Sequence, residues 1–179
     1  MNAIGTTLKD VYIITNKKFE DDRGFFIEVF NDEKFEAITG VKNFVQDNHS
    51  QSVKGVLRGL HYQVENPQGK LVRCTSGIVL DVVVDLRVYS PTFGKYTKIL
   101  LDSNDKQVWV PAGFAHGFYV ISDQAEVTYK ITDYYYPEHE RTLLWNDSVL
   151  NIDWGIVDEP ILSPKDKLGK TFVNCEKYV

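Results

Sequence analysis

The sequence predicts an all-β protein, either a sandwich or a barrel, on three observations. Short strand-like runs follow one another along most of the chain, and clusters of Gly, Pro, Asn, Asp and Ser separate them. Aromatic residues make up 13 % of the sequence, and flat rings pack well on a pleated sheet. The first half contains only one segment with the signals of a helix. Many short strands with frequent turns are typical of a sandwich or a barrel.

The first strands and the helix can be read in order. Residues 11–15 and 25–30 are expected to be extended, with a turn at 21–24 between them. Asn31 is placed to cap a helix that runs to about Thr39 and ends at Gly40. Further strands are expected at residues 44–48, 56–63, 70–75, 78–87, 96–101, 107–110, 117–121, 125–132 and 142–145.

The run at 78–87 shows how the two faces of such a strand differ. Its even positions, from Ile78 to Leu86, are all apolar, so this face must pack against something large. Its odd positions mix Asp81, Asp85 and Arg87 with valines. That second face either lines a cavity or pairs its charges with neighbouring side chains, and pairing is the commoner case.

Length and charge limit the organisation and the partners. A chain of 179 residues is expected to form one domain, residues 1–179. The formal net charge of -5 disfavours nucleic-acid binding, which needs a basic face. The sequence shows no signal peptide and no apolar run near the roughly 20 residues of a membrane helix, so we expect no membrane partner and a cytoplasmic location. Cys74 and Cys175 are expected to be free thiols.

The segments 44–50 and 56–63 carry the most unusual polar residues. Gln46 and Asn48 would share one strand face, whereas Arg58 and His61 would fall on opposite faces. If Arg58 and His61 serve one pocket, a bulge near Gly59 must re-aim one of them.

The histidines include two candidates for chemistry. An imidazole with an ordinary pKa of about 6.5 suits proton transfer near neutrality, which makes His61 the first candidate base, although a lone His in a strand is more often structural. His116, between a Pro-Gly turn and a strand, is either a ligand contact or a loop histidine bonded to the backbone. His49 and His139 have the surroundings of surface residues. The His-x-His spacing of metal-binding cupins is absent, so metal ligation is not favoured.

Several tyrosines and a C-terminal acid leave open alternatives. Tyr129 is either a core tyrosine or a phenol that projects into the interior and donates a proton. The tyrosines at 134–136 could stack on a flat ligand base or close one end of the barrel. Lys165 and Asp166 would ordinarily be surface charges, and Asp166 matters only if it reaches a histidine.

Taken together, these motifs resemble the dTDP-4-dehydrorhamnose 3,5-epimerase family. The resemblance runs in order along nearly the whole chain, and several long motifs in the right order are far more specific than one. The matching segments are residues 22–26, 44–48, 57–61, 68–73, 85–87, 90–94, 111–118, 129–130, 134–135 and 162–166.

The resemblance implies a cupin-like jelly roll, or double-stranded β-helix, with short peripheral helices, which forms a homodimer without metal or cofactor. It implies inversion of C3 and C5 of dTDP-4-dehydro-6-deoxy-D-glucose, a step of dTDP-L-rhamnose biosynthesis. His61 matches the catalytic base, Asp166 its acidic partner and Tyr129 the proton donor. Substrate contacts are implied for Arg23, Glu28, Gln46, Asn48, Arg58, Lys70, His116, Glu140 and Lys165.

This chemistry is physically consistent. The 4-keto group acidifies the hydrogens on C3 and C5, so His61 can remove one and leave an enolate. A cation such as Lys70 would stabilise the negative charge that develops on the ketone oxygen. Tyr129 would return a proton to the other face, while Asp166 would fix the tautomer of His61.

Three other functions remain as alternatives. A single-centre epimerase would invert only C3 or only C5 of a related nucleotide-linked 4-keto-6-deoxy sugar. A non-catalytic carbohydrate-binding jelly roll would explain the strands and aromatic residues, but not His61, Tyr129 and Asp166 together. A metal-dependent cupin oxygenase would need bound iron.

Overall fold

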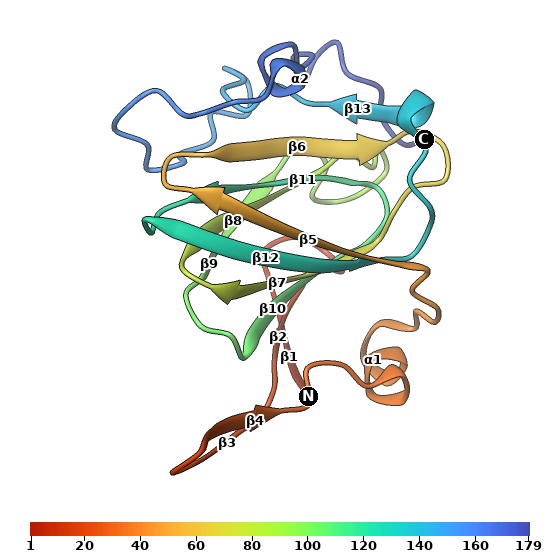
Figure 1. Ribbon diagram of the computed structural model, residues 1–179. Coiled ribbons are helices and arrows are strands. Elements are labelled where there is room, and N and C mark those ends of the chain that lie inside the picture. Colours follow the sequence, from red (N-terminus) through yellow and green to blue (C-terminus); the bar gives the residue numbers. More distant parts are fainter.

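A computed structural model describes all 179 residues, and it consists mainly of two antiparallel sheets that face each other (Figure 1). The six-stranded sheet has the order β1 (Asn2–Gly5), β2 (Tyr12–Thr15), β10 (Lys106–Val110), β7 (Lys70–Ser76), β12 (Gln124–Ile131) and β5 (Gln46–Val53). The five-stranded sheet has the order β13 (Glu140–Thr142), β6 (Leu57–Gln63), β11 (Phe114–Val120), β8 (Val79–Asp85) and β9 (Tyr96–Leu101). From β5 to β13 the chain passes back and forth between the sheets, with β8 and β9 as the only consecutive strands that stay in one sheet, and this confirms the predicted jelly roll.

The largest cluster of buried apolar side chains lies between the two sheets. It includes Val72 and Val127 from one sheet and Val83 and Val120 from the other. Burying these side chains removes apolar surface from water, at roughly 25 cal/mol per Å². A second cluster lies on the outer face of the five-stranded sheet, where the chain after β13 covers it.

Strand β8 contributes to both clusters, as its alternation predicts. Val79 and Val83 point between the sheets, while Val82, Val84 and Leu86 pack outward. The large partner of the apolar face is the C-terminal segment, which supplies Trp154 among others. Backbone hydrogen bonds hold this segment in place, for example from Leu57 N to the oxygen of Ile161 at 3.1 Å.

The predicted helix is confirmed at both ends. It is α1 (Asp32–Thr39), in which the Asn31 side chain accepts from Lys34 N and Gly40 has a φ of 72°. Phe35 is its buried residue and packs edge-to-face on Trp109, with ring centroids 5.0 Å apart. The second helix, α2 (Pro164–Lys167), is a single turn and was not predicted. A 3-10 turn at Pro137–His139 leads into β13.

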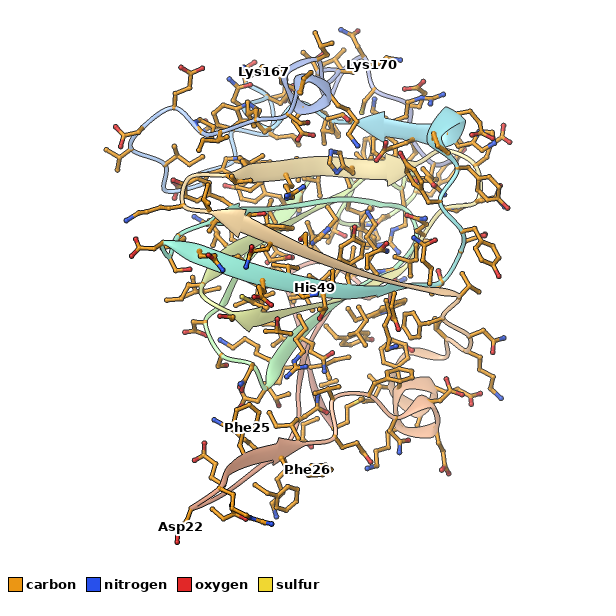
Figure 2. All side chains as sticks on the ribbon, in the orientation of Figure 1. Asp22, Phe25, Phe26, His49, Lys167 and Lys170 are labelled. Atoms are coloured by element: carbon orange, nitrogen blue, oxygen red, sulfur yellow. The ribbon has the colours of Figure 1, made fainter.

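A two-stranded hairpin of β3 (Lys18–Asp21) and β4 (Gly24–Ile27) projects away from the barrel (Figure 1). Asp22 stands at its tip, and Phe25 and Phe26 lie along it in Figure 2. Phe19, Phe25 and Phe26 are each more than half exposed. Such aromatic exposure on one small element is unusual for a surface that faces only water.

Several strand boundaries differ from the expectation. β5 extends to Val53 instead of ending at 48, and β4 ends at Ile27. The strand expected at residues 142–145 corresponds to β13, which ends at Thr142, three residues earlier than expected. β1 and β3 were not expected, because all their residues are exposed and leave no apolar alternation in the sequence.

Cys74 and Cys175 are free and buried, and no helix is long and apolar enough to cross a bilayer.

Candidate active site

A cavity of about 910 Å³ opens between the two sheets, near β5, β6 and the C-terminal segment. It is bounded by side chains from both sheets and from α2. It brings together every predicted site residue except Arg23 and Glu28, namely Gln46, Asn48, Arg58, His61, Lys70, His116, Tyr129, Glu140, Lys165 and Asp166. Figure 1 shows α2, which carries Asp166, lying over β6, which carries His61.

His61 and Asp166 form a hydrogen-bonded pair at the cavity wall. The ring Nε2 lies 2.5 Å from Asp166 Oδ1, although the residues are 105 positions apart in the chain. The second carboxylate oxygen accepts from Ser163 Oγ at 2.8 Å, and the same Oγ accepts from Asp166 N and caps α2. Asp166 is therefore not a surface charge. It reaches a histidine, which is the condition under which a role was expected for it from the sequence.

The surroundings of this pair shift both pKa values downward. Burial lowers the pKa of His61, and the hydrogen bond to Asp166 offsets only part of that effect. Burial also works to raise the pKa of Asp166, but the hydrogen bonds with His61 and Ser163 outweigh it and hold that pKa low. At neutral pH the pair is thus a neutral imidazole beside a carboxylate. His61 Nδ1 has no partner in the protein and is open to the cavity.

The predicted bulge at Gly59 is confirmed and explains how Arg58 and His61 share the cavity. Across the strand pair, Arg58 lies opposite Phe118 and His61 opposite His116, so β6 holds one extra residue. Gly59 has a φ of 132°, and a Cβ there would lie 2.5 Å from Gly117 Cα. The two backbones can approach so closely only because both residues at this crossing, Gly59 and Gly117, lack a side chain.

Lys70 and Tyr129 enter the cavity from the six-stranded sheet. Lys70 is buried, and its Nζ donates to the backbone oxygen of His61 at 3.2 Å. Burial lowers the pKa of Lys70 to about 8, although Glu140 and Asp81 favour its charge. Burial raises the pKa of the Tyr129 phenol. The Tyr129 hydroxyl makes no hydrogen bond within the protein and is open to the cavity.

Comparisons with known proteins identify the family to which this chain belongs. The family profile described as dTDP-4-dehydrorhamnose 3,5-epimerase matches residues 5–174. The chain belongs to this family. A family member from Pseudomonas aeruginosa is 53 % identical over 99 % of this chain and 99 % of its own. One from Neisseria gonorrhoeae is also 53 % identical over 99 % of this chain, which spans 54 % of that longer protein.

A solved structure of the epimerase family gives the same result for the fold. The dTDP-6-deoxy-D-glucose-3,5-epimerase from Legionella pneumophila, in complex with dTDP-4-keto-L-rhamnose, is 47 % identical. The match covers 98 % of this chain and 94 % of that chain, with a TM-score of 0.95. The similarity therefore extends over the jelly roll and the C-terminal segment that carries Asp166.

The mouth of the cavity in this epimerase-family chain is ordered by a small polar network. Glu140 accepts from Lys165 Nζ at 2.8 Å and from the Tyr135 hydroxyl at 2.9 Å. Tyr135 lines the cavity and remains about half exposed. Gln46 donates to Asn48 at 2.9 Å, so these two side chains share a face as predicted.

Both carboxylates of β8 pair with neighbouring side chains and neither lines the cavity, which is the commoner of the two readings that the sequence left open. Asp85 binds Arg87, Ser90 and Thr92 and has no place at the cavity. Asp81 is fully buried and accepts from His116 Nε2 at 2.7 Å. His116, which lines the cavity, is therefore not a loop histidine bonded to the backbone.

Arg23 and Glu28 do not reach the cavity of their own chain. The Arg23 side chain is 89 % exposed near the hairpin tip and pairs with Asp21. Glu28 follows the hairpin and pairs with Lys34 of α1. His49 and His139 pair with Glu126 and Glu65 and are surface residues, as expected.

Two contacts that support the histidines of the cavity were not predicted from the sequence. Ser163 donates to Asp166, and Asp81 accepts from His116. A signal for Ser163 was present, because a Ser followed three positions later by an acid is the pattern of a capping box. No three His, Cys, Asp or Glu side chains come together as a metal-ligand set.

Proposed function

We propose that this protein is a dTDP-4-dehydrorhamnose 3,5-epimerase that inverts C3 and C5 of dTDP-4-dehydro-6-deoxy-D-glucose on the route to dTDP-L-rhamnose. One observation carries the proposal. A His–Asp pair with a buried carboxylate faces a single cavity, which an unpartnered tyrosine hydroxyl enters from the opposite sheet and which also holds a buried lysine. Those are the groups needed to remove a proton beside a ketone and return one to the other face. The chain also matches the epimerase family over nearly its whole length.

His61 removes the proton in this mechanism. Its Nε2–H is held by Asp166, so the lone pair of Nδ1 points to the cavity. The lowered pKa of His61 keeps the ring neutral near pH 7, which is the form that can act as a base. Asp166 stabilises the imidazolium that forms when the proton is taken.

Lys70 stabilises the enolate that is left behind. With a pKa of about 8 its ammonium is mostly protonated at neutral pH, and the side chain is buried. A charge there interacts more strongly with a developing oxyanion than with a neutral ketone, which lowers the barrier. No oxidation occurs overall, so the proposed reaction needs no redox cofactor.

Tyr129 returns the proton. Because burial raises its pKa, the phenol stays protonated throughout the neutral range. Tyr129 belongs to β12 in one sheet and His61 to β6 in the other, so acid and base approach the sugar from opposite walls. Delivery from the opposite wall inverts the carbon.

The nucleotide end of the substrate fits the remaining polar residues. The Arg58 guanidinium is held by Ser52 Oγ at 3.0 Å and suits a diphosphate, as does the Lys165 ammonium at the mouth. The half-exposed ring of Tyr135 is available to stack on the thymine base.

A homodimer accounts for Arg23 and Glu28. The β3–β4 hairpin leaves the barrel and exposes Phe25 and Phe26 (Figure 2) together with Phe19. These side chains would be buried against a second copy. Arg23, which points away from its own cavity, would then complete the site of the partner. The proposed unit is a single domain, and its two free, buried cysteines are compatible with the reducing cytoplasm.

The direct test follows the substrate by proton NMR in deuterium oxide. Loss of both the C3 and C5 proton signals, with EDTA present and no cofactor added, is the expected result. Loss of one signal would indicate a single-centre epimerase instead. Binding without any exchange would contradict the proposal and favour a carbohydrate-binding jelly roll, and exchange that EDTA abolishes would favour a metal-dependent cupin.

The exchange of Arg23 between copies has its own test. We expect Arg23→Ala dimers to bind substrate weakly and His61→Ala dimers to be inactive. Mixed dimers of the two variants, assayed at low substrate concentration, should regain activity, because one site then has an intact His61 and receives an intact Arg23. Mixed dimers that remain as weak as the parents would show that Arg23 serves its own chain or no site.

A further inference from the structure

The cavity is faced by a second His–Asp pair that the proposed mechanism does not use. His116 on β11 and Asp81 on the adjacent strand β8 are hydrogen-bonded, with Nε2 2.7 Å from Oδ2. The exposed fraction of the side chain is 8 % for His116 and zero for Asp81. The pair is thus deeper than His61–Asp166, and it is built entirely within one sheet.

Asp81 has an unusual deficit of hydrogen bonds. Its Oδ1 has no partner, and it is the only buried side-chain nitrogen or oxygen atom of the protein without one. A buried carboxylate with an unpaired oxygen is costly unless a positive charge lies against it. Two cationic groups can offset this charge: the Lys70 ammonium, whose charged form Asp81 favours, and the His116 ring, the only group hydrogen-bonded to Asp81. A positive charge on His116 is the compensation in direct contact with the carboxylate.

The other nitrogen of His116 is free to act. Nδ1 makes no hydrogen bond in the protein, and it belongs to a ring that lines the cavity. In a doubly protonated ring, Nε2–H is committed to Asp81, and Nδ1–H is a second donor directed to the cavity. Other titratable groups near His116 are His61, which lies opposite it on the neighbouring strand β6, and Lys70, whose Nζ donates to the backbone oxygen of His61.

We propose that Asp81 is a positioning residue that holds His116 in its doubly protonated form, so that His116 Nδ1–H donates to the ketone oxygen as it becomes an enolate oxygen. The inference rests on the epimerase function proposed above. His61 takes the proton from carbon, and the electron pair of that C–H bond forms a C=C bond to the carbonyl carbon. The π pair of the C=O bond moves to the oxygen, where His116 and Lys70 stabilise the negative charge without giving up a proton. When Tyr129 protonates the carbon, the ketone re-forms and His116 is unchanged.

The protonation state can be measured without any substrate. Nitrogen-15 NMR of the histidine rings in the wild-type protein at pH 7 should show both nitrogens of His116 protonated, with the signals assigned through a His116→Gln variant. His61 in the same spectrum should show one protonated nitrogen. A His116 ring with only one protonated nitrogen would overturn the proposal, whatever the protein catalyses.

Kinetics test the link between Asp81 and the ketone oxygen. Asp81→Asn preserves shape and removes the charge, and we expect kcat to fall by about 10-fold to 100-fold with the affinity for dTDP unchanged. Because Asp81 acts through His116, the double variant with His116→Gln should be no slower than His116→Gln alone. Additive losses, an unchanged kcat, or a matching loss of dTDP affinity would each contradict the proposal.

Asp85→Asn is the matched control, since it removes another fully buried carboxylate from β8, away from the cavity. It should lower the melting temperature without lowering kcat. A failure of the proposed function is recognised separately, because the wild-type protein would then show no solvent exchange. Should Asp81→Asn fail to fold, the wild-type NMR result decides.

Discussion

The two His–Asp pairs at the cavity have the same chemical groups but different support. In the His61–Asp166 pair, both carboxylate oxygens are hydrogen-bonded, one to the ring and one to Ser163. In the His116–Asp81 pair, one carboxylate oxygen has no partner. A satisfied carboxylate can orient a neutral ring, whereas an unsatisfied one favours a charged ring. Identical side chains are therefore suited to a base in one place and to a fixed positive charge in the other.

Removal of the His61 ring should give the largest loss of activity, and it should show most clearly that the two pairs have different roles. We expect His61→Ala to abolish solvent exchange at both C3 and C5, because no other ring offers a free lone pair to the cavity. The measurement is deuterium incorporation by NMR, with exposed His49→Ala as the control. Wild-type turnover in His61→Ala would assign the base to His116 and reverse the comparison.

The next effect concerns the residue that faces both pairs from the opposite sheet. Tyr129→Phe should slow inversion by about 10²- to 10³-fold, within the range for loss of a general acid. Proton removal should be less affected, since His61 and Lys70 remain. Comparing deuterium exchange into recovered substrate with product formation checks this, and equal losses of both would place Tyr129 in binding. Inversion at the normal rate would move the donor to Tyr134 or Tyr135.

The support of His61 by Asp166 should appear in the pH profile. Asp166 works to raise the pKa of His61, so Asp166→Asn lets burial lower that pKa further. The base is active when neutral, so the acidic limb of kcat/KM should move to lower pH, while the maximal rate falls by about 10-fold or more. The pH profile of the Asp81→Asn variant should keep its acidic limb. A limb that moves in both variants would mean that the two pairs titrate together.

How far the sequence predicted each pair depends on how far apart its two residues lie along the chain. Asp81 lies in a run with strict alternation, so its interior face could be derived, as could the apolar face that packs under Trp154. The bulge followed from the need for Arg58 and His61 to share a pocket, because only Gly59 could accommodate it. Asp166 could not be placed by local pattern, since a 105-residue separation is closed only by the packing of the C-terminal segment.

Exposed elements were the ones that local pattern missed. β1 and β3 have no buried residue, so pairing with a neighbouring strand creates them without an apolar signal. β5 is an edge strand with a polar sequence, and its pairing with β12 along eight residues carried it beyond the apolar stretch. The site roles of Arg23 and Glu28 stay predictions, because the hairpin that carries Arg23 projects away from the barrel and neither residue lines the cavity of this chain.

The smallest predicted effect tests whether the hydrogen bond from Ser163 to Asp166 is what distinguishes the two pairs. Ser163→Ala removes both the cap of α2 and the donor to Asp166 Oδ2, which makes Asp166 resemble Asp81 with its unpaired oxygen. Loss of the cap should lower the free energy of unfolding by about 1 kcal/mol. The poorer support should favour the charged form of His61, shift the acidic limb of kcat/KM to higher pH and reduce the rate near neutrality several-fold. Ser163→Thr, which keeps the hydroxyl, should restore both properties. If Ser163→Ala changes stability alone, the hydroxyl serves only to begin α2, and a satisfied carboxylate is not what makes His61 the base.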